Sequence, residues 1–526
     1  MKQKLVIILK ASQDFIRHTS QDIKSNAPVL NSFFESITNF YIPILNMLDS
    51  IKLKNNGKLS MVLPPVLCSL LSDNEIKSLY LDWLSKKIEL GKKELERNSE
   101  NKNIQEIVKR NLEKNYQTKS DFEEKYNSDL ISAFAKNKKE GKLELLATCA
   151  TDIFIPHYAE TKEVISAQIE CGLTAYRQYF GEIPEGFWLP ELGYYPGVEK
   201  LIKAYGFSYT VLDSRAFLLA KKMPAKGIFY PVRTENSLVV FSNCTELDDK
   251  IFDEKGYISN ENYLNSNKDI GFELKMDELS PFMEIDSVRY STGYKYFNKS
   301  SSSESNLYNF EKASEQAKID ATDFAKIIKT KLDKVEKCIP ESDFINLFYC
   351  LELDSLKNWD ESILWLKNFL ESCDSNNLEL SGGTELIKNQ YSLEKFEPYY
   401  SAKGDGYGEE FLNGNTSWMM RYIKKASERI VDLADRFPND TGLKTRLLNL
   451  GAKELLMAQS VGLIKMINSC DNPDFAERRF KESIRAFTSV FDSLGSNTVS
   501  TEWLTTIEMQ DSIFPWMNYK VFAKKV

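Results

Sequence analysis

The sequence predicts a parallel α/β barrel followed by a helical C-terminal domain. Two observations support this fold class. Over residues 1–395, short apolar runs alternate with segments of helical periodicity, which is the pattern of repeated strand–helix units. Beyond residue 395 the strand pattern disappears and only helical spacing remains. At 526 residues, the chain is long enough for one large domain and a smaller one.

Eight runs rich in branched or aromatic residues are the expected strands. Most of them are followed by a stretch long enough to cross back over a parallel sheet as a helix. In chain order the expected strands are Lys4–Leu9, Leu59–Leu63, Leu143–Cys149, Phe187–Leu192, Tyr209–Leu212, Leu238–Ser242, Phe344–Leu353 and Glu379–Ser381.

Two insertions interrupt the alternation. Residues 73–139 are highly charged, and five apolar residues recur at helical spacing, which predicts a helical insertion. They are Ile76, Leu79, Tyr80, Trp83 and Leu84. Residues 248–305 are rich in Asn, Ser, Asp and Tyr and are expected to form a long surface loop region. Its serine-rich end, residues 300–305, has too little apolar content to order itself.

The C-terminal domain, residues 396–526, is predicted to be all-helical. Apolar residues at helical spacing define four segments, and Pro438 and Pro473 stand where helices should stop or start. The segments are Trp418–Phe437, Gly442–Asn468, Phe475–Leu494 and Thr501–Asp511.

Composition excludes several classes of function. A net charge of −8 argues against nucleic-acid binding, which needs clustered Lys and Arg. Eight cysteines without a CxxC spacing indicate reduced thiols in a cytoplasmic protein, not a disulfide framework or a zinc site. The N-terminal apolar run, Leu5 to Leu9, is too short for a signal peptide, and no later stretch approaches a membrane span. Only two histidines occur, so a multi-histidine metal centre is excluded.

The most informative segment is Gly186–Gly197, which places Glu191 at the end of an expected buried strand. A buried carboxylate is costly to desolvate and therefore has either a chemical task or a partner. Trp188, Tyr194 and Tyr195 on either side suit the apolar faces of a sugar ring. The structural alternative is a glutamate that pairs with a Lys or Arg of the barrel wall.

This segment resembles the nucleophile motif of glycoside hydrolase family 57, in particular its α-1,4-glucan branching-enzyme branch. Further resemblances follow in the family's order along nearly the whole chain. They are Phe40–Pro43, Leu63–Pro65, Ala150-Thr151 with Phe154–Pro156, Asp213-Ser214, Ser291–Tyr296, Phe411–Gly414 with Trp418, Met457–Ser460 and Ile513–Pro515. The resemblance implies an incomplete, seven-stranded β/α barrel over residues 1–395.

The resemblance also implies where the chemistry should be. The family's nucleophile position is Glu191, whereas its acid/base aspartate is replaced by Cys350 in Tyr349-Cys-Leu-Glu-Leu353. A buried thiol is a weak proton donor. Glu352 shares a strand face with Cys350 and is either a substitute acid or a supporting carboxylate. Trp188, Tyr194, Asp213, Tyr296 and Trp418 are the expected substrate-binding residues.

Other pocket positions depart from the family together, while the flanking motifs are preserved. Family histidines are replaced by Lys10, Ser12, Asp152 and Arg215, an Arg-Asp pair by Asn243-Cys244, and tryptophans by Phe252, Ala402 and Phe411. The exchange of neutral histidines for full charges favours ion pairs across the pocket. We therefore expect Lys10 or Arg215 within salt-bridge distance of Glu191, in a cleft too narrow for a glucan chain.

Two functions are consistent with these residues. By family resemblance, the chain is an α-1,4-glucan branching enzyme, or glucanotransferase, acting on glycogen-like polymers without a cofactor or metal, but with impaired or absent catalysis. The alternative is a noncatalytic glucan-binding or protein-interaction scaffold built on the same barrel. The expected partners are an α-glucan or, for a scaffold, another protein; nucleic acid and membrane are not expected.

Overall fold

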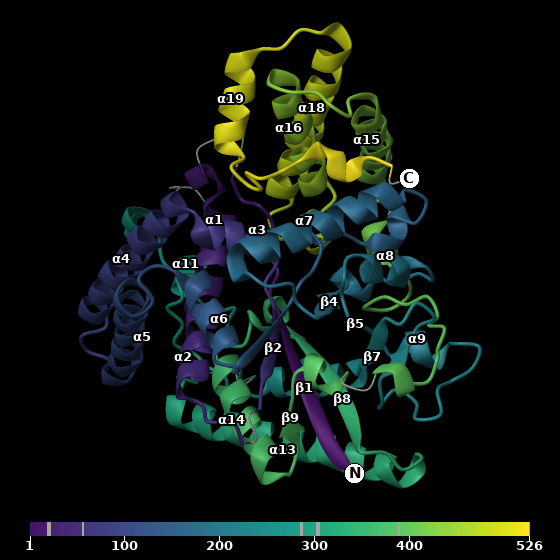
Figure 1. Cartoon of the computed structure of the whole chain (residues 1–526). Helices are drawn as coiled ribbons and strands as arrows, with labels where there is room; N and C mark the ends of the chain where they lie inside the picture. Colours follow the sequence, from purple (N-terminus) through teal and green to yellow (C-terminus); the bar gives the residue numbers. More distant parts are fainter. Residues whose placement is uncertain (18–22, 55–56, 284–287, 301–305, 388–389, 525–526) are drawn as a thin grey trace.

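The computed structural model describes residues 1–17, 23–54, 57–283, 288–300, 306–387 and 390–524 (Figure 1). Its centre is a parallel sheet in the order β3-β2-β1-β8-β7-β5-β4. Ala147, which follows β3, bridges to Phe187 of β4 and brings the two ends of the sheet together into a nearly closed barrel. The strands are β1 (Lys2–Lys10), β2 (Leu59–Val62), β3 (Leu143–Leu146), β4 (Gly186–Trp188), β5 (Tyr209–Asp213), β7 (Val239–Asn243) and β8 (Phe344–Glu352).

Two short strands complete the sheet: β6 (Val232–Arg233) pairs antiparallel with β7, and β9 (Glu379–Leu380) pairs with β1. The predicted fold class is confirmed. One expected strand was too long, because β4 ends at Trp188 and Pro190–Leu192 form a 3₁₀ turn. Proline cannot donate to a strand ladder, and Glu191 has a left-handed backbone, so the strand cannot continue.

Alternation along the strands separates two hydrophobic cores. In β1, Leu5, Ile7 and Leu9 pack outward in the large cluster shared with the helices. Val6 and Ile8 belong to a second cluster with Phe348 and other residues from all around the barrel, which fills its interior. Because side chains on a strand alternate between faces, the even residues of β1 and β8 point inward up to the ends of those strands.

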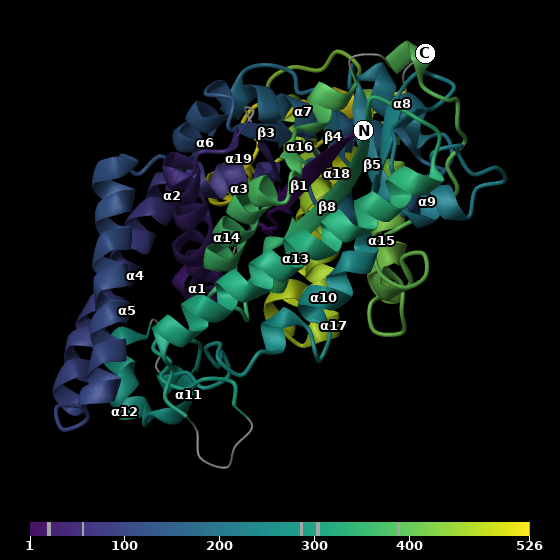
Figure 2. The same ribbon diagram turned by 90° about the horizontal axis from the view of Figure 1, so that it is seen from below.

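Helices surround the barrel, and Figure 2 shows α13 crossing its outer side. The helices of the barrel region are α1 (Ala27–Ser36), α2 (Ile42–Ser50), α3 (Pro65–Ser72), α7 (Lys162–Phe180), α8 (Val198–Ala204), α9 (Arg215–Leu218), α13 (Phe310–Cys338) and α14 (Ser362–Ser375). Between α1 and α2 lies a five-residue π-helix, η2 (Ile37–Tyr41).

The insertion over residues 73–139 is helical, as predicted. It consists of α4 (Asn74–Arg97), α5 (Lys102–Ser120) and α6 (Leu130–Lys139), and α4 and α5 project to one side of the molecule (Figure 1). Of the five residues predicted to share one face of α4, four are buried and Leu79 is partly buried. Tyr80 and Trp83 stack at 5.8 Å between ring centroids. Asp73 caps α4 by accepting hydrogen bonds from the amides of Glu75 and Ile76.

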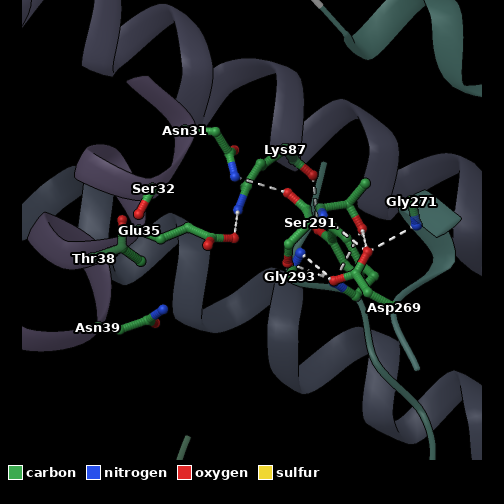
Figure 3. A network of polar contacts seen from close by, with 12 residues as sticks. Asn31, Ser32, Glu35, Thr38, Asn39, Lys87, Asp269, Gly271, Ser291 and Gly293 are labelled. Atoms are coloured by element: carbon green, nitrogen blue, oxygen red, sulfur yellow. Dashed lines mark hydrogen bonds and ion pairs between the residues drawn. The ribbon is translucent and has the colours of Figure 1, made fainter. Parts of the chain in front are cut away.

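The second insertion, residues 248–305, contains α10 (Asp248–Phe252), α11 (Ile270–Glu273) and α12 (Met276–Leu279) between loops. Most of its serine-rich end, residues 301–305, lies outside the described residues. A buried carboxylate, Asp269, organises the rest. It accepts hydrogen bonds from the amides of Gly271, Thr292 and Gly293 and from the hydroxyls of Ser291 and Thr292, at 2.6–2.9 Å (Figure 3).

The C-terminal region is helical, as predicted, and lies across one end of the barrel region (Figure 1). Its helices are α15 (Ser417–Arg436), α16 (Leu443–Ala458), α17 (Val461–Ser469), α18 (Pro473–Ser496) and α19 (Thr501–Gln510). The segment expected as one run, Gly442–Asn468, is divided into α16 and α17. Ser460 caps α17 at this break, and the amide of Val461 donates to the carbonyl of Asp152 instead of continuing α16.

Asp269→Asn should destabilise the protein strongly, because an amide group would face donors that now bind a carboxylate. Hydrogen bonds to a charged group contribute about 1.5–3 kcal/mol each, so we expect a loss of about 3 kcal/mol or more in the free energy of unfolding. Urea denaturation measures it. Asp277→Asn, an exposed acid on α12, is the control and should stay within about 0.5 kcal/mol of wild type. Equal stability of the two variants would contradict the structural role of Asp269.

Candidate active site

Charged and polar side chains converge where the strands of the barrel end. Parallel strands present their carboxyl ends at one edge, which is where barrel enzymes place their active sites. Lys10, Asp213, Asn243 and Glu352 are the last residues of β1, β5, β7 and β8, and strand alternation points them inward. Asp152 follows β3, and Glu191 follows β4. Lys10 and Glu352 are direct partners in the β1–β8 register.

Glu191 is held in an unusual backbone conformation. Its φ and ψ are 53° and 21°, and Leu192 also has a positive φ of 49°. Two consecutive non-glycine residues in the left-handed region are strained, and such strain persists where surrounding contacts enforce it. Here the amide of Lys403 donates to the Glu191 carbonyl at 2.7 Å, and Tyr194 bridges to Ser401. The strand-end turn therefore fixes the direction of the carboxylate.

Two lysines surround the Glu191 carboxylate, which is only 2% exposed. Lys465 Nζ lies 2.6 Å from Oε1, and Lys10 Nζ lies 3.7 Å from the same oxygen. The other oxygen, Oε2, is buried without a hydrogen-bond partner. Burial raises the pKa of Glu191, but Lys465 and Lys10 outweigh it and hold the pKa below its ordinary value. The carboxyl is therefore ionised at neutral pH.

The predicted cation beside Glu191 is confirmed for Lys10 and wrong for Arg215. Arg215 instead donates through Nε to Asp213 at 2.7 Å and contacts the carbonyl of Ala402. The sequence analysis missed Lys465, which lies 274 positions away in α17. Only the docking of α17 on the barrel brings it to Glu191, and no local pattern around Lys465 signals this.

Three of the replaced positions form one hydrogen-bonded group. Lys10 Nζ donates to Ser12 Oγ at 2.8 Å and to Asp152 Oδ2 at 3.1 Å, and the lysine side chain is 1% exposed. Burial lowers the pKa of Lys10, but Asp152 and Glu191 reverse this and raise it well above its usual value. The side chains of residues 10, 12 and 152 thus satisfy one another's hydrogen-bonding groups.

Glu352, like Glu191, is paired with a lysine. Glu352 forms a salt bridge with Lys403, and both lie beside Cys350. Burial raises the pKa of Glu352, but Lys403 and Lys10 lower it to about 2. Burial raises the pKa of the half-buried Cys350 thiol well above its ordinary value. At neutral pH, then, Glu352 carries no proton and Cys350 releases its own with difficulty.

Hydrogen bonds hold the first residues of helix α17, which carries Lys465, against the barrel. Ser460 Oγ donates to Asp14 Oδ1 at 2.5 Å, and the amide of Val461 donates to the carbonyl of Asp152 at 2.7 Å. Gly462 lies directly against Asp14, where an added Cβ would come within 2.0 Å of Oδ2. Burial raises the pKa of Asp14 to about 6. A side chain at position 462 would have to displace the Asp14 carboxylate, which holds the start of the helix that carries Lys465.

The five residues expected to bind substrate do not form one surface. Trp188 and Tyr194 are each 1% exposed, which corrects the expectation that their rings present free faces to a sugar. Trp188 lies in the barrel interior, because residues that end a barrel strand can point inward. The hydroxyl of Tyr194 donates to Glu199 at 3.1 Å. Asp213 is fully buried beside Arg215.

Tyr296 and Trp418, the other two residues expected to bind substrate, lie elsewhere in the structure. The hydroxyl of Tyr296 donates to Glu94 Oε2 at 2.6 Å, and its ring packs in the hydrophobic cluster of the helical insertion. Tyr296 therefore stabilises the insertion. Trp418, on α15, is half-buried against Phe480 at 5.3 Å between ring centroids. His157 packs edge-on against Phe154, and burial lowers its pKa. Within the described parts of the chain, no group of three or more His, Cys, Asp or Glu side chains is placed to hold a metal ion.

A nearly closed parallel barrel with carboxylates at the strand ends defines the class of barrel glycosidases and their relatives. The chain belongs to glycosyl hydrolase family 57, whose sequence profile matches residues 6–401. Residues 422–522 match the profile described as 1,4-alpha-glucan branching enzyme, C-terminal.

Individual relatives agree with this assignment. A 1,4-alpha-glucan branching enzyme of Thermococcus kodakarensis is 25% identical over 476 residues, covering 85% of this chain and 67% of that protein. The alpha-amylase AmyC from Thermotoga maritima superposes with a TM-score of 0.92 at 28% identity over 100% of both chains. The structure of the Thermococcus enzyme in complex with glucose and additives superposes with a TM-score of 0.86 at 21% identity, over 100% of this chain and 97% of that chain.

Glu352→Gln should flatten the acid dependence of stability. The folded pKa of Glu352, about 2, is below the ordinary value of 4.5, so its ionised form contributes stability above pH 4.5 that is lost as pH falls toward 2. At 1.36 kcal/mol per pKa unit, the contribution is about 3 kcal/mol at most. Urea unfolding between about pH 6 and about pH 3 measures the slope.

The matched control for this experiment is Glu397→Gln, which changes an exposed glutamate close to the same rim. It should keep the wild-type slope. An identical pH slope for wild type and both variants would show that the Glu352–Lys403 pair does not depress the pKa of Glu352.

Proposed function

We propose that this family 57 protein binds α-glucan through its barrel but does not transfer glycosidic bonds efficiently. The observation that carries the proposal is the state of the two carboxylates at the barrel mouth. Glu191 and Glu352 are each paired with lysine, and both have lowered pKa values. Retaining glycoside chemistry needs one free carboxylate as nucleophile and one protonated group as acid.

Neither Glu352 nor Cys350, the two candidates for the acid, suits that role. Glu352, with a pKa of about 2, holds no proton near neutral pH. The thiol of Cys350 is a weaker acid than an ordinary cysteine because burial raises its pKa. General acid catalysis typically contributes about 10²–10⁴-fold to rate, so its loss alone would reduce turnover severely.

The paired Glu191 carboxylate is also a weaker nucleophile than an unpaired carboxylate. Lys465 binds Oε1 of Glu191 at 2.6 Å, and Lys10 approaches the same atom. This double pairing stabilises the anion and holds cations where the anomeric carbon of a sugar would have to approach. A neutral glucan would gain little by displacing these ion pairs, since breaking a buried pair leaves an uncompensated charge.

Several features support a glucan ligand. The family and the C-terminal profile are both those of glucan-active proteins, and a relative of the same fold holds glucose. The proposed activity requires neither metal nor cofactor. We also infer a cytoplasmic setting, because all eight cysteines are free thiols. Among the described helices, none has the length and apolarity needed to cross a membrane.

A protein-interaction scaffold is the second candidate, and a groove on the outer wall of the barrel favours it. The groove, of about 720 Å³, lies between α13 and the segment that follows α9. Its floor is apolar, and Leu218 and Met223 on its border are about half exposed. Apolar grooves with charged rims are typical of protein-binding surfaces.

Purified protein should branch amylose at a rate at least about 10²-fold below that of an active family 57 branching enzyme assayed in parallel. Loss of iodine staining and chain-length profiling after debranching both report the reaction. The expected result is no detectable change over hours at equal enzyme concentration. Turnover comparable with that of the active enzyme would refute the proposed loss of catalysis.

Any residual activity should depend on Glu191. Glu191→Gln should abolish it, because no other described carboxylate lies at the nucleophile position. Glu352→Gln should reduce the rate more for substrates with poor leaving groups, if Glu352 is the substitute acid. Glu106→Gln, which changes an exposed glutamate on α5, is the control and should leave the rate unchanged. Full rates in both Glu191→Gln and Glu352→Gln would assign the activity to a contaminant.

A further inference from the structure

A ridge of exposed tyrosines lies beside the barrel mouth. Tyr399 and Tyr400 are each 47% exposed, although large aromatic rings are usually buried. Their ring centroids are 5.5 Å apart, and Tyr400 is 5.8 Å from Tyr407, with each pair close to perpendicular. We call these three residues the tyrosine ridge. Tyr399 and Tyr400 expose aromatic surface to solvent, whereas Tyr407 is half-buried beside Tyr400, and exposed apolar surface of this kind commonly marks a binding site.

The backbone under the ridge is fixed to the strand ends. The amide of Tyr399 donates to the carbonyl of Ala216, just after β5, and Lys403 is bonded to the Glu191 carbonyl. Tyr407 donates its hydroxyl to the carbonyl of Tyr194 at 2.9 Å. Gly408, with a φ of +82°, passes so close to Phe154 that an added Cβ would lie 2.4 Å from the ring. The rings therefore stand on a rigid support, which reduces the entropic cost of binding.

The ridge is distinct from the aromatic positions expected by family resemblance. Those positions are Ala402 and Phe411, which are 0% and 1% exposed and offer no ring to a ligand. The exposed rings stand before and between them in the chain. An aromatic surface is thus present at the rim, outside the lysine–carboxylate network that fills the mouth.

We propose that the tyrosine ridge is a surface-binding site for α-glucan chains, used independently of the barrel mouth. The inference rests on the proposed function and deepens it by naming the binding surface. The C–H faces of glucose pack on aromatic rings, and adjoining rings let neighbouring glucose units of one chain rest on the same surface. The tyrosine hydroxyls and nearby carboxylates can hydrogen-bond to sugar hydroxyls.

Charge around the ridge favours a neutral polyhydroxylated ligand over a protein. Four exposed acids, Glu397, Asp405, Glu409 and Glu410, lie within three residues of the tyrosines in the sequence. Charged residues are depleted from the cores of protein interfaces, because an unpaired charge is costly to desolvate. A hydrated sugar chain needs no such desolvation, since its hydroxyl groups can donate to these carboxylates.

Affinity electrophoresis in native gels containing glycogen tests the proposal with the full-length protein. Tyr399→Ala/Tyr400→Ala should raise the dissociation constant for glycogen by about tenfold or more, the scale expected when aromatic contacts are lost. Tyr400→Phe, which keeps the ring, should stay within about twofold of wild type. Tyr116→Ala is the matched control, since Tyr116 is 46% exposed on α5, in the helical insertion, and it should bind like wild type.

The outcomes separate the proposals. Unchanged glycogen binding by the double variant would overturn the ridge while leaving the proposed glucan-binding function intact. Failure of wild type to bind glycogen would overturn both. Unchanged binding accompanied by a shift in the oligomeric state of the double variant, measured by light scattering, would assign the ridge to a protein contact. Thermal unfolding of each variant verifies that these exposed substitutions leave the fold unchanged.

Discussion

The constraint on which the rest of the site depends is the burial of the Glu191 charge. An ionised carboxylate removed from water must be neutralised by paired charges or hydrogen bonds. Lys465 and Lys10 provide this, and Lys10 in turn shares its charge with Asp152. Lys403 neutralises Glu352 next to it. The result is a network of ion pairs around both carboxylates at the barrel mouth.

This network joins the barrel to the C-terminal helices. Besides Lys465, the contacts are Asp14 with Ser460 and the hydrogen bonds of Thr151 and Gln168 to α16 and Gln459. The barrel profile and the C-terminal profile are separate along the sequence, but the candidate site contains residues from both. The C-terminal helices therefore contribute directly to the electrostatics of Glu191, as well as covering the end of the barrel.

The motifs shared with the family serve the scaffold more than the chemistry. Ser291–Tyr296, one of the longest of them, surrounds Asp269 and reaches Glu94 in the helical insertion, away from the strand ends. Satisfying a buried carboxylate with several donors fixes the local backbone, and this requirement persists whether or not the barrel is catalytic. Resemblance to the family in this motif thus reports the fold.

The sequence by itself determined the barrel, the helical insertion, the helical C-terminal region and the place of Glu191 at a strand end. These follow from periodicity and from local motifs, because the burial of a strand and the amphipathicity of a helix depend on residues that are close in the sequence. It also anticipated a cation at Glu191, either Lys10 or Arg215, since charged residues of both signs stand where the family has neutral histidines, and the structure places Lys10 there. Only the tertiary structure decided that Lys465 is the nearer partner, that Arg215 binds Asp213, and that Trp188 and Tyr296 are buried in different clusters. Contacts across hundreds of residues depend on how helices dock on the barrel, and no local pattern encodes that geometry.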